Sequence, residues 1–418
     1  MNPSHRFGRR SFCRASLALA ASLALWQTGC SQNAGHNAVP QGTPTIRVLL
    51  LENQKQVELS AIAAPTVHVG SDSAGQQLRF SPGVSAPILL SPTGWKVGSA
   101  QLPRGELTIE QSTDGSVYVA KHAYHGRFRF VPAGPDRFDV VNDLDAESYL
   151  CGVLRSELFA DWHDETYKAQ AIVARTYALY EARTDGVGRH FDVYTDQRSQ
   201  VYGGIDAESD RSRRATAETA GIVVAYGPPG RETIFKSYFS SCCGGAGQSA
   251  ADAFGDPDTP ALAAQNHGAC CIHSPKFNWG PITIPKAELT RRVRAWGAFK
   301  KQPIKDMAPL MRIEIAALNQ FGRPVRFVIT DAKGAHYVLR SEQMREAVNT
   351  EAAAGPKIFS SFCKPLDEGA NIRFADGHGY GHGVGMCQWC AQSQAANGYN
   401  DEAIVLGAFP GARLVRAY

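Results

Sequence analysis

Short runs of hydrophobic, β-branched and aromatic residues, some alternating with polar ones, dominate the chain between residues 46 and 141. Glycine and proline separate these runs, as they commonly do between strands. Runs of this length and composition predict β-strands, so we expect a β-rich part over residues 44–145. The clearest candidates are residues 46–51, 107–110, 117–120 and 128–131.

The pattern changes near Leu150, beyond which a long helix is expected over residues 165–183. Its apolar positions repeat at helical spacing and define one buried face. Asp161 or Asp164 is the expected N-cap. The positions that define the face are Ala169, Ile172, Val173, Thr176, Tyr177, Leu179 and Tyr180.

Strands and helices remain mixed over residues 146–418, without a regular alternation of the two. This mixture predicts the α+β class for a single domain of residues 44–418. Further helices are expected at residues 286–296 and 388–397, and further strands at residues 221–226, 234–239, 311–318 and 324–329.

Residues 1–30 are typical of an export signal. Two adjacent arginines, which suit the Tat or the Sec route, precede an apolar run that is too short to span a bilayer. Small residues before Cys30 resemble a lipoprotein cleavage site; the alternative is a soluble protein cleaved near Cys30. We expect an exported envelope protein, anchored on the periplasmic side by a lipid on Cys30, with residues 31–43 as a flexible tether.

The formal charge of +4 comes from this N-terminal segment. Four of the 43 basic residues lie in residues 1–29, which contain no acid, so 39 basic residues face 39 acidic ones in the remainder. A nearly neutral protein gives no reason to expect nucleic-acid binding.

Glu157 is the first candidate for chemistry, because Leu154, Leu158, Phe159 and Trp162 are its neighbours in the sequence. Apolar surroundings disfavour an ionised carboxylate and raise its pKa. A raised pKa lets a general acid hold its proton near neutral pH. The alternative is a glutamate at a helix N-terminus, where the helix dipole favours negative charge.

Two other segments hold polar side chains suited to binding. On the helix of residues 165–183, Lys168 and Arg175 are two turns apart and would line one groove; solvated surface charges are the alternative. Residues 377–386 contain His378 and His382 among closely spaced glycines. Such glycines permit close approach of backbone to a packed neighbour or to a ligand, and a histidine there would bind sugar or transfer protons.

Eight cysteines follow Cys30, and in an oxidising compartment disulfides are the first expectation. We predict a structural staple between the pair at residues 242–243 and the pair at residues 270–271. The alternatives are a structural zinc that also uses His267 or His273, and free thiols. The eight are Cys151, Cys242, Cys243, Cys270, Cys271, Cys363, Cys387 and Cys390.

A series of motifs, in this order, resembles the stage II sporulation protein D family, also called SpoIID/LytB. The resemblance covers roughly residues 45–418, and its motifs are long. The matching segments are residues 149–157, 168–177, 199–204, 219–221, 241–245, 274–279 and 379–389.

The family includes lytic transglycosylases that cut peptidoglycan glycan strands stripped of peptides, and members described as amidase enhancers. Its catalytic glutamate corresponds to Glu157. The resemblance implies that Glu157 protonates the glycosidic oxygen and that the muramoyl C6 hydroxyl then closes on C1, giving a 1,6-anhydro end. The side chains expected to contact the strand are Lys168, Gln170, Arg175, Tyr177, Gln200, Tyr202, His378, Tyr380, His382 and Gln388.

The expected partner is therefore the glycan strand, and the membrane is reached only through the lipid on Cys30. The alternative function is a non-catalytic wall-binding protein that activates an N-acetylmuramoyl-L-alanine amidase. A third class, a cysteine hydrolase, would need the Cys271 and His273 pair. No cofactor is predicted and no metal ligand is assigned. The zinc site that some family members have near residues 199–204 is not expected, because Ser199 stands where a cysteine would be. A role in sporulation is not implied.

Overall fold

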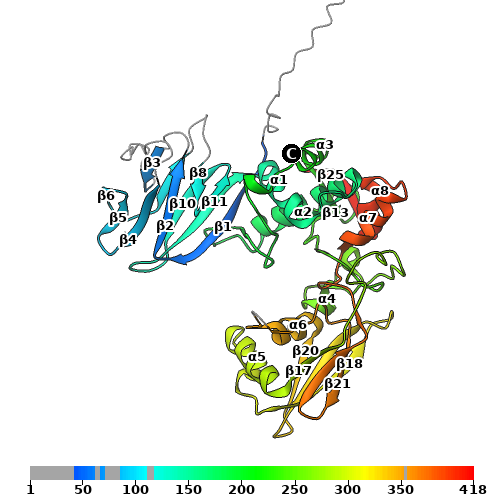
Figure 1. Cartoon of the computed structure of the whole chain (residues 1–418). Coiled ribbons are helices and arrows are strands. Elements are labelled where there is room, and N and C mark those ends of the chain that lie inside the picture. The colour runs from blue at the N-terminus through cyan, green and yellow to red at the C-terminus, as the bar shows by residue number, and fades with distance from the viewer. Residues whose placement is uncertain (1–41, 62–65, 71–84, 111–116, 353–354) are drawn as a thin grey trace, which may run out of the picture. The chain divides into compact units, whose positions relative to one another are not determined.

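The computed structural model describes residues 42–61, 66–70, 85–110, 117–352 and 355–418. Contacts divide the chain into two units, residues 1–38 and 39–418, and all the described residues belong to the second. The predicted export signal and Cys30 lie outside the described residues, as does nearly all of the predicted tether. The second unit combines helices with several sheets, which confirms the α+β class (Figure 1).

Two six-stranded sheets form the N-terminal part and share one hydrophobic core. Trp95 is fully buried in that core, and its indole nitrogen donates to the Gly105 carbonyl over 2.9 Å. The first sheet contains β12 (Val193–Tyr194), β1 (Thr45–Gln54), β11 (Phe138–Asp145), β10 (Arg127–Pro132), β7 (Leu107–Glu110) and β3 (Thr66–Val69). The second contains β6 (Ala100–Leu102), β5 (Gly94–Val97), β4 (Ala86–Ser91), β2 (Gln56–Ala61), β8 (Val117–Val119) and β9 (His122–Tyr124).

Helices α1 (Ala146–Glu157) and α2 (Asp164–Arg183) follow directly from β11. Asp145 caps α1 by accepting from the Ser148 amide over 2.9 Å. The N-cap of α2 is His163, whose side chain makes no capping bond, so the predicted cap at Asp161 or Asp164 is wrong. Asp164 is instead the first helical residue, where an acid is favoured by the helix dipole.

A second hydrophobic core lies between α2, α7 (Gln388–Ala396) and α8 (Asp401–Ala408). Most of the expected strand over residues 234–239 is absent, since only its two ends belong to strands. Between them, the Ser237 hydroxyl donates to the Val173 carbonyl of α2 over 2.8 Å. Small sheets complete this region: β14 (Thr233–Ile234), β13 (Ile222–Tyr226) and β25 (Arg413–Arg416) in one, and β15 (Phe239–Ser240) parallel to β24 (Met386–Cys387) in another. The short helices here are α3 (Asp210–Glu218), α4 (Ala250–Ala253), η1 (Ile205–Ala207) and η2 (Pro260–Leu262).

A third core belongs to residues 278–375, where α5 (Lys286–Phe299) and α6 (Ser341–Asn349) pack on strands (Figure 1). The sheets are β17 (Ile282–Pro285), β22 (Asn371–Ala375) and β21 (Lys364–Glu368), then β18 (Leu310–Leu318), β19 (Pro324–Asp331) and β20 (His336–Arg340), then β16 (Asn278–Trp279) with β23 (Gly377–His378). A single 3-10 turn, η3 (Pro303–Asp306), follows α5. No helix of the described residues is long and apolar enough to cross a membrane.

Candidate active site

Glu157 is the last residue of α1, and its half-buried carboxylate receives two hydrogen bonds. The Val201 backbone amide donates to Oε1 over 2.9 Å. The Gln388 side-chain amide, from the first residue of α7, donates to Oε2 over 3.4 Å. The alternative of a glutamate at a helix N-terminus is therefore wrong, since α2 begins only at Asp164.

The environment of Glu157 favours the protonated acid. Burial raises the pKa of the Glu157 carboxyl above its usual value, and the bonds from Val201 and Gln388 oppose this only in part. The position at the C-terminal end of α1 acts in the same direction as burial, because the helix dipole is negative there. The carboxyl therefore keeps its proton to a higher pH than an exposed glutamate does, as a general acid requires.

Glutamine side chains surround this carboxylate. Gln170, fully buried on α2, accepts from Gln388 over 3.5 Å, and its own Nε2 has no partner among the described residues. Gln200 is also fully buried and accepts from the Tyr149 hydroxyl over 3.0 Å. Gln200 thereby fixes the loop whose next residue, Val201, donates to Glu157.

An aromatic cluster follows Glu157 in the chain. The rings of Phe159 and Trp162 are 5.3 Å apart, and both lie near Trp389, at 6.0 and 5.0 Å. Phe159 is 55% exposed, so the cluster presents one ring to solvent. Phe159 is two residues after Glu157 in the chain, and Trp389 directly follows Gln388. From the sequence, Phe159 and Trp162 were expected only as apolar neighbours of Glu157. Trp389, directly after Gln388, is the residue that would have indicated an aromatic cluster.

Four predicted contact residues have structural partners instead. Arg175 is fully buried and pairs with Glu147 at 2.7 Å, so the predicted groove shared with Lys168 is wrong. Lys168 pairs with Glu165 and with Glu218. A buried cation must be paired, and here the pair ties α2 to α1.

Tyr177 and Tyr202 are likewise buried and support the core. The Tyr202 ring lies 5.2 Å from that of Tyr149, and its hydroxyl donates to Asn142 over 3.2 Å. A side chain at Gly152 would meet the Tyr202 ring at 2.7 Å, so glycine is required for this close packing.

The histidines of the glycine-rich segment have contacts away from Glu157. His378 bonds Asn278 at 2.8 Å, and His382 packs against Tyr238 and Phe254. Burial, with the charges of two arginines, lowers the pKa of His382 to about 3, so this imidazole is neutral at ordinary pH. The expectation that either histidine lies within one sugar ring of Glu157 stays a prediction.

Tyr380 is 41% exposed, and its backbone pairs with that of Cys242 through bonds of 3.0 and 2.8 Å. A side chain at Gly379 would meet the Cys242 carbonyl at 2.6 Å. The glycines in this segment therefore serve close backbone packing here. A cavity of about 1000 Å³ adjoins the segment, and its lining includes His378, Trp279 and Phe362 but not Glu157.

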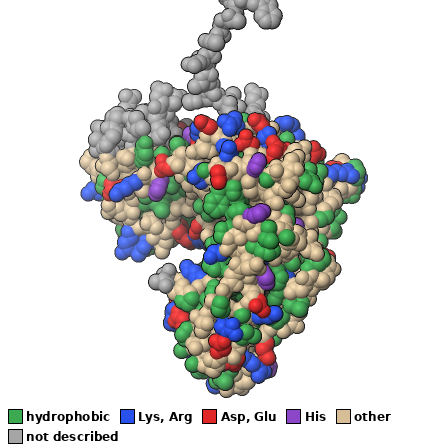
Figure 2. All heavy atoms as spheres, turned by 45° about the vertical axis from the view of Figure 1, so that its right-hand side comes forward, with side chains coloured by type: hydrophobic (Ala, Val, Ile, Leu, Met, Phe, Trp, Pro, Cys, Tyr) green, Lys and Arg blue, Asp and Glu red, His purple; other side chains and the backbone are tan. Residues whose placement is uncertain are grey.

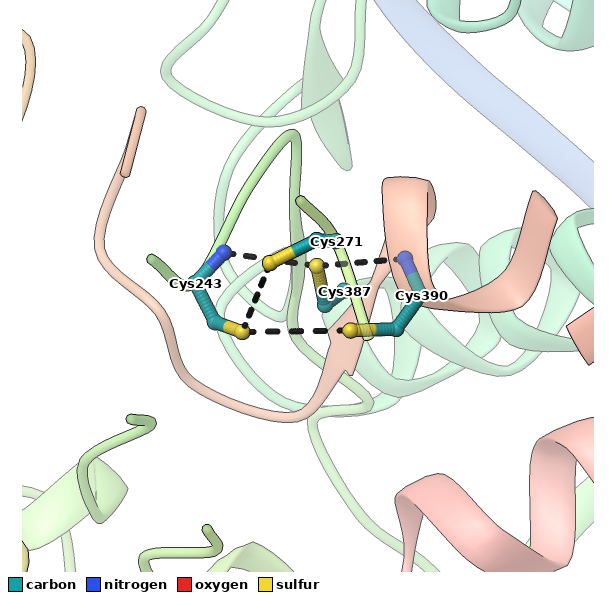
Figure 3. A group of neighbouring side chains, drawn as sticks. All are labelled: Cys243, Cys271, Cys387 and Cys390. Atoms are coloured by element: carbon teal, nitrogen blue, oxygen red, sulfur yellow. Dashed lines mark hydrogen bonds between the residues drawn. The ribbon is translucent and has the colours of Figure 1, made fainter. Parts of the chain in front are cut away.

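The cysteine-rich loop and the start of α7 meet in a cluster that we call the cysteine junction, residues 242–243, 270–271 and 387–390 (Figure 3). The two adjacent pairs approach closely, as predicted, with Cys243 Sγ 3.5 Å from Cys271 Sγ. All eight described cysteines are free, so the predicted disulfide is not formed. The predicted staple joined only the two adjacent pairs, whereas the cluster also contains Cys387 and Cys390 of the C-x-x-C motif.

Charged side chains of both signs are interspersed over the face drawn in Figure 2, in keeping with the nearly neutral composition.

Comparison with known proteins places these features in a family. Residues 135–226 match the family model described as SpoIID, stage II sporulation protein, and this segment includes Glu157, Gln170 and Val201. The chain is 30% identical over 279 residues to an uncharacterised protein of Brachyspira hyodysenteriae, covering 65% of this chain and 67% of that protein. It is 22% identical over 299 residues to a Bacillus subtilis protein named amidase enhancer, covering 63% of this chain and 40% of that protein.

The chain belongs to the SpoIID family. Gln388 and the cysteine junction lie outside the segment that the family model matches.

Proposed function

We propose that this protein is a lytic transglycosylase that cleaves peptide-free glycan strands of peptidoglycan, with Glu157 as its catalytic residue. The observation that carries the proposal is the half-buried Glu157 carboxyl, whose pKa is raised by burial and which is held by Val201 and Gln388. Both hydrogen bonds to Glu157 come from amides, and neither involves a second carboxyl group. A hydrolase of the two-carboxylate type would need a second acid nearby.

A single carboxyl suffices when the substrate supplies the nucleophile. Glu157 gives its proton to the glycosidic oxygen as the bond from C1 of N-acetylmuramic acid breaks. The C6 hydroxyl of the same sugar then attacks C1 and returns its proton to Glu157. The products are a free 4-hydroxyl on one fragment and a 1,6-anhydro end on the other, and no water is consumed.

The cluster of Phe159, Trp162 and Trp389 supports a carbohydrate substrate, because aromatic rings pack well against the apolar faces of sugars. Export and lipid anchoring at Cys30 belong to the same proposal, since the substrate lies outside the cytoplasm.

Analysis of the products tests the proposed reaction. Purified protein is incubated with peptide-free glycan strands, and the new ends are identified by mass spectrometry. We expect anhydro ends, lighter by one water molecule than hydrolysed ones. Reducing ends, or an absence of cleavage by the folded protein, would overturn the proposal.

The second candidate is a non-catalytic activator of a cell-wall amidase, and it is favoured by the printed name of the Bacillus subtilis relative. Under this hypothesis the protein accelerates release of stem peptides by a purified amidase. Glu157→Gln would retain that acceleration, whereas glycan cleavage would be absent for both variant and wild type.

A further inference from the structure

Four cysteine thiols converge in the cysteine junction. The Sγ atoms of Cys243, Cys271, Cys387 and Cys390 all lie within 4.8 Å of one another, and all four residues are buried (Figure 3). The Cys243 sulfur is 3.5 Å from that of Cys271 and 3.9 Å from that of Cys390. A tetrahedron with Zn–S bonds of about 2.3 Å has sulfur atoms about 3.8 Å apart. The spacing is therefore that of a tetrathiolate metal site.

We propose that Cys243, Cys271, Cys387 and Cys390 bind one structural zinc ion. Binding deprotonates all four thiols, so four protons leave as one Zn²⁺ enters, and the centre carries two negative charges. No oxidation or reduction takes place. The four ligands are one cysteine from each adjacent pair and both cysteines of the C-x-x-C motif at the start of α7. They include neither His267 nor His273, which were considered from the sequence.

Backbone amides point at one of the four sulfur atoms, in an arrangement that suits a metal-bound thiolate. The backbone amides of Cys243 and Cys390 donate to Cys387 Sγ over 3.3 and 3.4 Å. Two amide donors on one buried sulfur stabilise a thiolate more than a neutral thiol, because hydrogen bonds to an ionised acceptor are stronger. Cys387 is also the N-cap of α7, where the helix dipole favours negative charge.

A buried cation supplies the compensating charge. Arg323 is fully buried, and its guanidinium donates to the carbonyl oxygens of Cys243 and Ala246 over 3.0 and 2.8 Å. Among the described residues no carboxylate forms an ion pair with Arg323 within 4.0 Å. A buried guanidinium needs a counter-charge. The charge of Glu342 acts on Arg323 from beyond ion-pair distance, and a doubly negative metal centre beside Cys243 would add to it.

The proposed site would tie together segments that are far apart in sequence. Cys243 and Cys271 belong to the loop between β15 and β16, whereas Cys387 and Cys390 fix the first turn of α7. Gln388, which directly follows Cys387, donates to Glu157. A link between the metal and catalysis rests on the proposed function; the metal site itself does not.

Metal analysis of the full chain tests the site without reference to activity. The protein is purified without chelators from zinc-replete medium and examined by elemental analysis, and by X-ray absorption spectroscopy. We expect about one zinc ion per chain with four sulfur neighbours at about 2.3 Å. Protein that lacks metal, that holds iron, or that shows two disulfides by intact mass would each overturn the assignment.

Matched variants identify the ligands. Cys387→Ser and Cys390→Ser should lose the zinc, whereas Cys363→Ser should retain it, because Cys363 is an equally buried thiol outside the group. If a ligand variant fails to fold, cobalt substitution of the wild type tests whether thiolates bind the metal, through sulfur-to-metal charge-transfer bands. A cobalt spectrum without these bands contradicts the proposal, as does unchanged zinc content in both ligand variants.

Discussion

Two buried regions of this protein are built on different principles. The N-terminal sheets share a continuous core of aliphatic and aromatic side chains with Trp95 fully buried among them. The cysteine junction is made largely from loops, and its buried members are mostly cysteines. The first region is stabilised by buried apolar area and tight packing. The second depends on cysteine sulfur atoms that contact one another. The difference matters because Glu157 lies at the end of α1, which packs on the first region, and accepts a hydrogen bond from Gln388 of the second.

The largest expected effect lies in the apolar region. Trp95→Ala removes the ring that contacts Phe130 and Phe138 edge-on, with centroids 6.4 and 5.2 Å away. We expect a loss of about 3–5 kcal/mol in the stability of these sheets, measured by amide hydrogen exchange. Exchange in the cysteine junction should change little. Equal acceleration in both regions would contradict their independence.

A smaller effect is expected at the bond that joins the two regions. Gln388→Leu removes a donor to the ionised Glu157, so the pKa of Glu157 should rise further. The protonated form is the active acid, so activity present below this pKa is lost above it. The alkaline limb of the activity profile should therefore move to higher pH, with a rate loss of about tenfold, the loss expected for one positioned hydrogen bond.

Gln394→Leu, a change of the same size on the same helix, is the control for that experiment, because no bond from its side chain to Glu157 exists in the described structure. A Gln388 variant with an unmoved alkaline limb would show that the two regions are not coupled through this contact.

The smallest effect concerns the exposed ring beside the site. Phe159→Ala should raise KM for glycan strands by up to about tenfold, because an aromatic contact is worth about 0.5–1.5 kcal/mol, and kcat should change less. Phe299→Ala is the matched control, since Phe299 is also exposed, at 78%, but lies on α5. Equal KM values for the two variants would remove the aromatic cluster from substrate binding.

Local patterns predicted the regular elements well. The strand at residues 107–110 coincides with β7, and the alternation there reflects one buried face. The start of α2 was predicted to within one residue, but its N-cap residue was predicted wrongly. Several polar residues precede the helix, and tertiary contacts determine which of them is the cap.

Contacts between distant segments could not be predicted in this way. Arg175 has the same pattern as a surface cation until its partner Glu147, 28 residues away, is known. The partners of Cys243 within the junction are 28 and 147 residues away. The raised pKa expected for Glu157 agrees with its burial in the structure. Its place at the end of a helix depended on where α1 stops, which the sequence pattern did not define.

The most direct test of the central claim compares two buried carboxyls. Burial raises the pKa of both Glu157 and Glu181, but Glu181 pairs with Lys236 at 2.8 Å, whereas Glu157 accepts bonds from Val201 and Gln388. The cleavage rate on peptide-free glycan strands is measured for Glu157→Gln and Glu181→Gln, with folding checked by circular dichroism. We predict that Glu157→Gln slows cleavage by about 10²–10⁴-fold, the usual contribution of a general acid, while folded Glu181→Gln stays close to the wild-type rate. A Glu157→Gln protein that cleaves as fast as the wild type, or no more slowly than Glu181→Gln, would contradict the assignment of Glu157 as the catalytic acid.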